Sequence, residues 1–180
     1  MFKKFTVKDI VFLAIFSAVL LAVGGLVMPL VMFTHIYALR QLVSAPLFAL
    51  FCIIAIYKVP KPGALSIIGL ITGLVLSFMS PIMFFNNFFG AVIAELITLL
   101  IFRSYEKPAA PVLAAGLYIP LTLPITLVST QIMKGKSIAE QINDPMQTVW
   151  IVIGTFILSF LGAFIGKKIA KELRKAGKLL

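Results

Sequence analysis

The sequence has very few residues of the kinds that build catalytic and metal sites. Its 180 residues include one cysteine, one histidine and six acidic residues. A single cysteine cannot form an intrachain disulfide or a cysteine metal cluster. The sequence also has no HExxH or GxSxG motif and no complete phosphate-binding loop. We therefore expect no catalytic residue, no metal site and no cofactor in this chain, and no ATP hydrolysis by the chain alone.

Charged residues are also scarce, at 12% of the chain, whereas apolar residues make up 61% and the mean hydropathy is +1.12. Soluble domains are about 45–50% apolar, so this composition excludes an ordinary water-soluble protein. A hydrocarbon core about 30 Å thick requires roughly 20 apolar residues for each helical crossing. The chain therefore has room for about six crossings and for no separate soluble domain.

Prolines, glycines and charged residues divide the chain into apolar segments. These segments predict transmembrane helices at roughly 9–28, 42–57, 64–80, 86–102, 109–132 and 146–168. We predict an all-α integral membrane protein in which residues 1–180 form a single transmembrane domain, a bundle of six helices. The segment from Pro29 to Gln41 is expected to be a loop on the side opposite the N-terminus.

Basic residues are unequally divided between the two sides of this predicted bundle. If the N-terminus is cytoplasmic, only three of the 16 Lys and Arg residues lie outside, namely Arg40, Lys134 and Lys136. Cytoplasmic segments normally carry the excess, so we predict that both termini are cytoplasmic, in a bacterial plasma membrane. The net charge of +10 then reflects topology and not nucleic-acid binding, because the basic residues cluster between apolar segments.

Glu95 is the single acidic residue deep within a predicted span. A charge at the membrane centre costs about 2.5–3.5 kcal/mol, so we expect this side chain to face protein. Two interpretations stay open: Glu95 receives a donor or cation from a ligand, or it is protonated or paired with Tyr118 or a threonine for packing. Asn87 lies toward the outer end of the same helix, where Asn86 and Asn87 have the alternative of capping the helix.

The next predicted helix places Tyr118, Thr122 and Thr126 on one stripe, because they are spaced by four residues. A polar stripe can line a cavity, although membrane threonines also bond their own backbone or a neighbouring helix. In the last helix, Gln147 and Trp150 lie at the outer end. There the indole can stack on a flat ligand or anchor the helix at the interface.

The first outer loop contains His35, Tyr37 and Arg40, which either fold over a pocket as a lid or are ordinary interfacial residues. We expect all these polar positions toward the outer half of the bundle. We therefore predict an outward-facing site for a small molecule, with these candidate contacts: Asn87, Glu95, Tyr118, Thr122, Thr126, Gln147, Trp150, His35, Tyr37 and Arg40.

Small residues recur on the first predicted helix, at Ala14, Ala18 and Ala22. A ridge of alanines lets another helix approach closely. Together with the run Lys8-Asp9-Ile10-Val11, the Ala14-x-x-x-Ala18 spacing and the chain's length and topology, this ridge resembles the S components of energy-coupling factor (ECF) importers. The basic ending from Gly166-Lys167-Lys168 to Lys175-Ala176-Gly177 resembles the Trep_Strep branch of that group.

The resemblance implies a membrane subunit that captures a vitamin or vitamin precursor from outside. It further implies docking through Ala14, Ala18 and Ala22 onto a membrane scaffold subunit, with two cytoplasmic ATPases that use the ATP. The polar residues favour a small flat molecule with donors, such as hydroxymethylpyrimidine or pyridoxine.

Two other classes of function are alternatives for this sequence. A membrane-embedded enzyme using Glu95 and His35 lacks an accompanying catalytic constellation. The main alternative is a self-sufficient small transporter or channel that forms a homo-oligomer, through the first helix or through Gly162 and Gly166.

Overall fold

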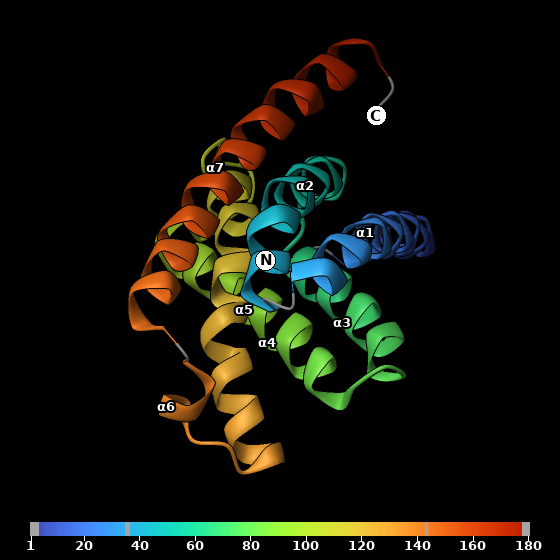
Figure 1. The fold of residues 1–180 in the computed structure, drawn as a ribbon. Coiled ribbons are helices and arrows are strands. Elements are labelled where there is room, and N and C mark those ends of the chain that lie inside the picture. Colours follow the sequence, from blue (N-terminus) through green and yellow to red (C-terminus); the bar gives the residue numbers. More distant parts are fainter. Residues whose placement is uncertain (1–3, 35–36, 143, 178–180) are drawn as a thin grey trace.

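Helices account for most of the residues in the computed structural model, which describes 4–34, 37–142 and 144–177, with side chains except those of 28, 30–34 and 37–40. Within these ranges there is no β-strand. The helices are α1 (Val7–Thr34), α2 (Tyr37–Lys58), α3 (Ala64–Ser77), α4 (Pro81–Phe102), α5 (Ala110–Lys134), α6 (Ile138–Gln141) and α7 (Pro145–Lys175). Figure 1 shows the long helices gathered side by side around a common interior.

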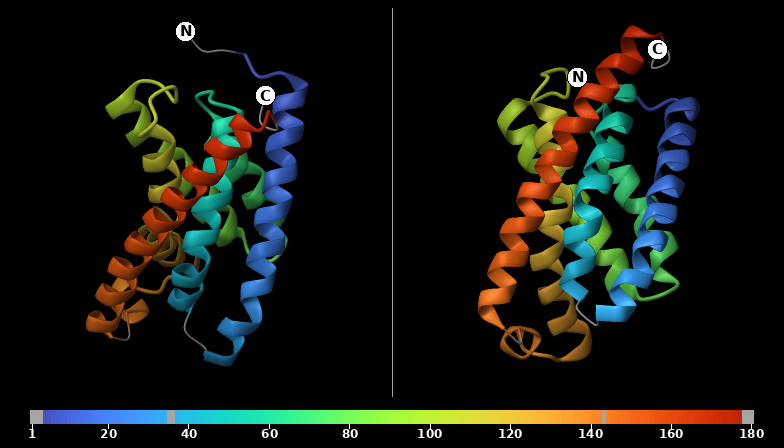
Figure 2. Two further views of the ribbon diagram at one scale, coloured as in Figure 1. Left: turned by 90° about the horizontal axis from the view of Figure 1, so that it is seen from above. Right: turned by 45° about the horizontal axis from the view of Figure 1, so that its top comes forward.

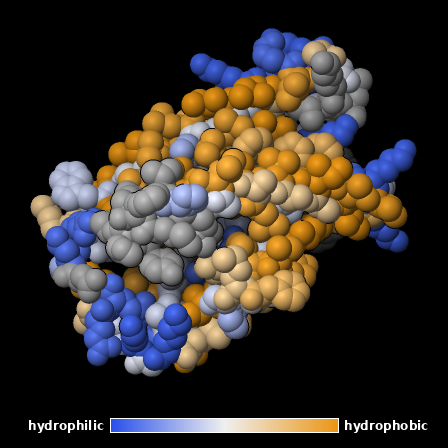
Figure 3. All heavy atoms as spheres, turned by 45° about the vertical axis from the view of Figure 1, so that its right-hand side comes forward, coloured by the Kyte–Doolittle hydropathy of each residue, from blue (hydrophilic) through white to orange (hydrophobic). Residues whose placement is uncertain are grey.

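The lengths and compositions of these helices are those of a membrane protein. Among the described residues, five helices are long and apolar enough to cross a bilayer: α1, α2, α4, α5 and α7. Figure 3 shows apolar residues covering the middle of one face, with hydrophilic residues gathered toward its ends. The all-helical membrane fold that composition predicted is thus confirmed, and each long helix overlaps one of the predicted apolar segments.

The third predicted segment ends earlier than expected. We predicted a helix over 64–80, but α3 stops at Ser77 after 14 residues, a length of about 21 Å against a core of about 30 Å. The reason is the Ser80-Pro81 pair. Ser80 is extended, as the residue before a proline tends to be, and Pro81 starts α4. The predicted joint at 80–85 is therefore mostly the first turn of α4.

The predicted first loop is largely helical. α1 continues to Thr34, with Pro29 inside it, and α2 begins at Tyr37. The expectation of a loop from Pro29 to Gln41 was therefore wrong over its described part. A proline within a membrane helix is tolerated because neighbouring groups can satisfy the freed backbone carbonyl.

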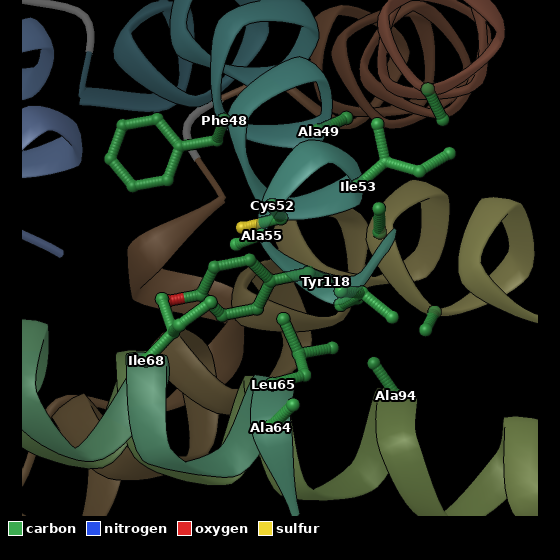
Figure 4. Close-up of a cluster of buried hydrophobic side chains, with 14 of the residues drawn as sticks. Phe48, Ala49, Cys52, Ile53, Ala55, Ala64, Leu65, Ile68, Ala94 and Tyr118 are labelled. Atoms are coloured by element: carbon green, nitrogen blue, oxygen red, sulfur yellow. The ribbon is translucent and has the colours of Figure 1, made fainter. Parts of the chain in front are cut away.

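Helix α2 is central: it contacts α1, α3, α5 and α7. Its pairing with α7 is close because glycines face it, and a Cβ at Gly162 would lie 2.1 Å from the Pro46 carbonyl oxygen. Figure 4 shows the interior beside α2, where Tyr118 lies among Cys52, Leu65 and Ile68. The glycine pair Gly162 and Gly166 thus serves helix packing, the use that GxxxG patterns usually have in membranes.

The start of α1 and the end of α7 lie at the same end of the bundle (Figure 2). We call this the terminal end and the opposite one the α6 end, after the short helix there. At the terminal end, an ion pair between Lys61 and Asp9 holds the start of α1 to the α2–α3 turn. Helix α7 has 31 residues, about 46 Å, and in Figure 1 and the right view of Figure 2 its basic last turns extend past the other helices. The assignment of the terminal end to the cytoplasm stays a prediction from charge.

Candidate functional site

A cavity of about 600 Å³ opens at the α6 end, between the start of α7 and the adjacent part of α2. This volume lies within the range of about 300–1,000 Å³ that small-molecule sites usually have. Its walls combine apolar, aromatic, amide and carboxylate side chains, contributed by Leu42, Asp144, Met146, Gln147, Trp150, Ile151 and Gly154. We refer to this space as the α2–α7 cavity.

The first turn of α7 shapes the α2–α7 cavity. Asp144 caps the helix: its carboxylate accepts hydrogen bonds from the backbone N–H groups of Met146 at 2.9 Å and Gln147 at 3.2 Å. Pro145 takes the first helical position, where a missing N–H costs nothing. Gln147, Trp150 and Gly154 then follow at spacings of three and four residues, which places them on one face of the helix.

Gly154 lets the two helices approach at the inner part of this cavity. A Cβ there would lie 2.8 Å from Leu42 Cδ1 of α2, so any side chain at this position would displace the leucine. At the open side, the Trp150 side chain is 63% exposed. The α2–α7 cavity thus offers an indole face for stacking and an amide and a carboxylate for hydrogen bonds.

Sequence reasoning found Gln147 and Trp150 but missed the other lining residues. Asp144 carried a readable signal, since an aspartate directly before a proline and an apolar run is typical of a helix N-cap. Leu42 and Ile151 carried none, because their position in a cavity depends on how α2 and α7 pack.

Four of the predicted residues of α4 and α5 form a separate group, in which Tyr118 and Thr122 are buried and Asn87 and Thr126 are half-buried. The Tyr118 hydroxyl donates to Asn87 Oδ1 at 3.0 Å, and Asn87 Nδ2 donates to the Met83 carbonyl at 2.8 Å. Thr122 and Thr126 donate to the backbone carbonyls of Ile119 and Thr122. This is the back-bonding within a helix that the sequence left open as an alternative. None of these residues lines the α2–α7 cavity, and a contact with substrate stays a prediction for them.

Asn86 is a polar residue that the sequence left without a role beyond a possible cap. α4 begins at Pro81 with Ser80 as its N-cap, so neither Asn86 nor Asn87 caps the helix. The Asn86 side chain is 8% exposed, and its Oδ1 has no hydrogen-bond partner within the described part of the chain. A buried acceptor without a partner is costly, which makes Asn86 a further candidate for contact with a bound molecule.

Glu95 lies in the part of α4 nearer the terminal end of the bundle, and it caps the first turn of α3. Its carboxylate accepts hydrogen bonds from the Gly63 N–H at 2.7 Å and the Ser66 N–H at 3.0 Å, and from the Ser66 hydroxyl. The first N–H groups of a helix have no partner within the helix, and they attract negative charge. Glu95 therefore acts as a cap supplied by a neighbouring helix, which is a packing role of a kind the sequence did not suggest.

Tyr105, in the turn after α4, is buried beside this carboxylate and is 2% exposed. Burial, and next the Glu95 carboxylate, raise the pKa of Tyr105 well above its ordinary value. Glu95 is thus enclosed by the α2–α3 turn and the α4–α5 turn. It lies far from the first residue of α4, which is at the α6 end of the bundle. Glu95 therefore lies in the opposite half of the bundle from Gln147 and Trp150, so the expectation that all the polar candidates gather in one half was wrong.

Helix α1 has a packed face and a free face. The packed face meets α2 and α3 and holds fully buried residues such as Leu13, Ser17 and Leu20. On the other side, Ala18 and Ala22 are exposed, and Ala14 is half-buried at the edge. The free face also carries exposed larger apolar residues, among them Val11, Ile15 and Leu26. We call the line of Ala14, Ala18 and Ala22 within it the alanine strip.

The remaining predicted contacts lie outside the described residues. This holds for His35 altogether and for the side chains of Tyr37 and Arg40, whose backbone belongs to α2. Across the described ranges, no group of His, Cys, Asp and Glu side chains is arranged to hold a metal ion.

Comparisons with known proteins agree on the kind of molecule. The model of the Trep_Strep family, described as hypothetical bacterial integral membrane proteins, matches residues 7–173. A solved structure described as the crystal structure of an S-component of ECF transporter superposes with a TM-score of 0.64 at 18% identity, over 98% of this chain and 89% of the other. No curated protein matches the chain. Since the family model spans most of the sequence, the chain belongs to the Trep_Strep family of bacterial integral membrane proteins.

Proposed function

We propose that the protein is the substrate-capture subunit of an ECF-type importer. The observation that carries this proposal is the shared fold with an S component along nearly the whole of both chains. Two features of this chain support it: an open cavity at the α6 end, whose mainly apolar lining includes Asp144 and Gln147, and the alanine strip on α1. If the terminal end is cytoplasmic, as the basic residues indicate, the cavity faces outside.

The substrate is a small flat molecule that bears hydrogen-bond donors. Trp150 offers a stacking surface, Gln147 an amide, and Asp144 a carboxylate beside them. A pyrimidine or pyridine vitamin precursor fits this set, and hydroxymethylpyrimidine and pyridoxine are the compounds to titrate against purified protein. If neither binds below millimolar concentration, this substrate class is wrong, while the assignment as a capture subunit is tested separately.

The alanine strip is the docking face for a membrane scaffold subunit. Short side chains let a partner helix approach closely, and close packing drives helix association where lipid removes the hydrophobic advantage. The partner complex would include two cytoplasmic ATPases, which supply the ATP hydrolysis.

Substitutions on the alanine strip test the docking. We expect Ala18→Leu together with Ala22→Leu to leave substrate affinity unchanged and to reduce uptake by cells at least tenfold, because both positions are exposed and neither lines the cavity. Ile157→Phe, at an exposed position of α7, is the matched control and should transport normally. Normal uptake by the alanine variant would show that docking occurs elsewhere.

A further inference from the structure

A second cavity, of about 500 Å³, runs between α4 and α5 on the surface of the bundle. Its walls are almost wholly apolar, with Ser129 as a hydroxyl-bearing member, and they run from Phe85 to Ile93 on α4 and from Leu121 to Met133 on α5. We call it the α4–α5 groove. It shares no lining residue with the α2–α7 cavity.

The groove opens toward the membrane. Phe85 and Phe89 form one wall, with parallel rings whose centroids are 5.9 Å apart. These side chains are 37% and 41% exposed, and Val128 on the facing wall is 49% exposed. Large apolar side chains that remain half-exposed along a cavity on a membrane-spanning surface are in contact with lipid chains and not with water.

The length of the groove matches one acyl chain. On α5 it extends from Leu121 to Met133, a distance of about 18 Å at 1.5 Å per residue. One leaflet contributes half of a hydrocarbon core about 30 Å thick, or about 15 Å. A chain lying in the groove would therefore reach from the bilayer midplane to the head-group level at the α6 end.

Two lysines lie at the end of the groove, next to Met133. α5 terminates at Lys134, and Lys136 follows after Gly135, which takes a left-handed conformation with φ 67°. Both lysines are exposed, so their ammonium groups can turn toward a phosphate at the membrane surface. Outside the terminal end the chain has few basic residues, and two of them lie at this one position.

We propose that the α4–α5 groove is a binding site for one anionic phospholipid from the leaflet at the α6 end. One acyl chain fills the groove between the phenylalanines and α5, and the phosphate pairs with Lys134 and Lys136. A lipid of this kind supplies both complementary parts, an apolar chain of one leaflet's length and a negative head group. The site is separate from the capture and docking roles and does not depend on them.

Native mass spectrometry of the full-length protein tests the proposal. Protein from nanodiscs that contain phosphatidylglycerol and phosphatidylcholine with the same acyl chains should retain phosphatidylglycerol preferentially. Lys134→Gln with Lys136→Gln should weaken its retention roughly 30-fold, from the usual contribution of two basic residues at a membrane surface. Lys167→Gln with Lys168→Gln removes the same charge near the terminal end and should change nothing at this site.

A second variant tests the groove itself. Val128→Trp adds bulk at a half-exposed position, so it can occupy the groove without disturbing the packed interior. It should lower retention of both lipids while the melting temperature stays within the range of the other variants. Equal retention of the two lipids by the wild-type protein, equal loss in the two lysine variants, or unchanged retention by Val128→Trp would each overturn the proposal.

Discussion

Removal of the Glu95 carboxylate should destabilise the fold without abolishing a binding site. In Glu95→Ala, the N–H groups of Gly63 and Ser66 and the Ser66 hydroxyl lose their acceptor at the start of α3. A buried donor left without a partner costs about 1–3 kcal/mol. Both residues are half-buried, so some water can reach them. We therefore expect a loss of about 2–4 kcal/mol in the free energy of unfolding.

Ser66→Ala, alone and combined with Glu95→Ala, separates the contribution of the hydroxyl hydrogen bond from the rest of this loss of stability. Ser66→Ala removes only the hydroxyl hydrogen bond and should cost about 1 kcal/mol. In the double variant, the two effects should not add, because the hydroxyl already lacks its acceptor once Glu95 is gone. Glu172→Gln is the control, since this acid pairs with Lys175 at the exposed end of α7, where an ion pair contributes little.

The assay is reversible denaturant unfolding in mild detergent, with substrate affinity measured on the same preparations at low temperature. We expect lower stability and retained affinity, because the Glu95 side chain of α4 caps the start of α3 and does not line the α2–α7 cavity. Unchanged stability with lost affinity would refute this reasoning and return Glu95 to the role of a ligand contact.

Three other predictions follow from the packing, the ionisation and the cavity. Gly166→Ala should destabilise by about 1–3 kcal/mol through overpacking, since its Cβ would lie 2.4 Å from Ile53 Cγ2, whereas Gly25→Ala, with nothing within 4 Å, should be neutral in the same unfolding assay. The raised pKa of Tyr105 means that the folded state holds this proton more tightly than the unfolded state, so stability should fall as the pH rises above the ordinary value of 10; Tyr105→Phe should flatten that slope. Trp150→Ala should weaken substrate binding at least tenfold and leave the melting temperature unchanged because the side chain is 63% exposed; equal binding would remove the indole from the site.

The membrane fold could be predicted from the sequence because bilayer thickness imposes one length on every spanning helix. The departures occur where local chemistry outweighs hydropathy. The Ser80-Pro81 pair separates α3 from α4, and counting apolar residues does not reveal this boundary. The predicted first loop is too long because a proline usually ends a helix, whereas Pro29 lies inside α1.

The candidate site was only partly accessible to sequence reasoning. Gln147 and Trp150 share a cavity because three residues along a helix return to the same face. Glu95 shows the opposite case: an acid in a membrane helix has to find partners, but the sequence does not say which. The partners are backbone N–H groups of α3, about 30 residues earlier in the chain, and only the packing of α3 on α4 brings them together. The unpaired Oδ1 of Asn86 could not be predicted either, because its lack of a partner also depends on how the helices pack.

The most direct test of the proposed function is mass spectrometry of the proteins and small molecules that co-purify with the tagged chain from its native membrane in mild detergent. We expect a larger membrane subunit, two ATPases and a bound metabolite with a flat polar ring. Recovery of the chain alone, as a stable homo-oligomer with no ATPase, would rule out the capture-subunit function and favour a transporter that works by itself.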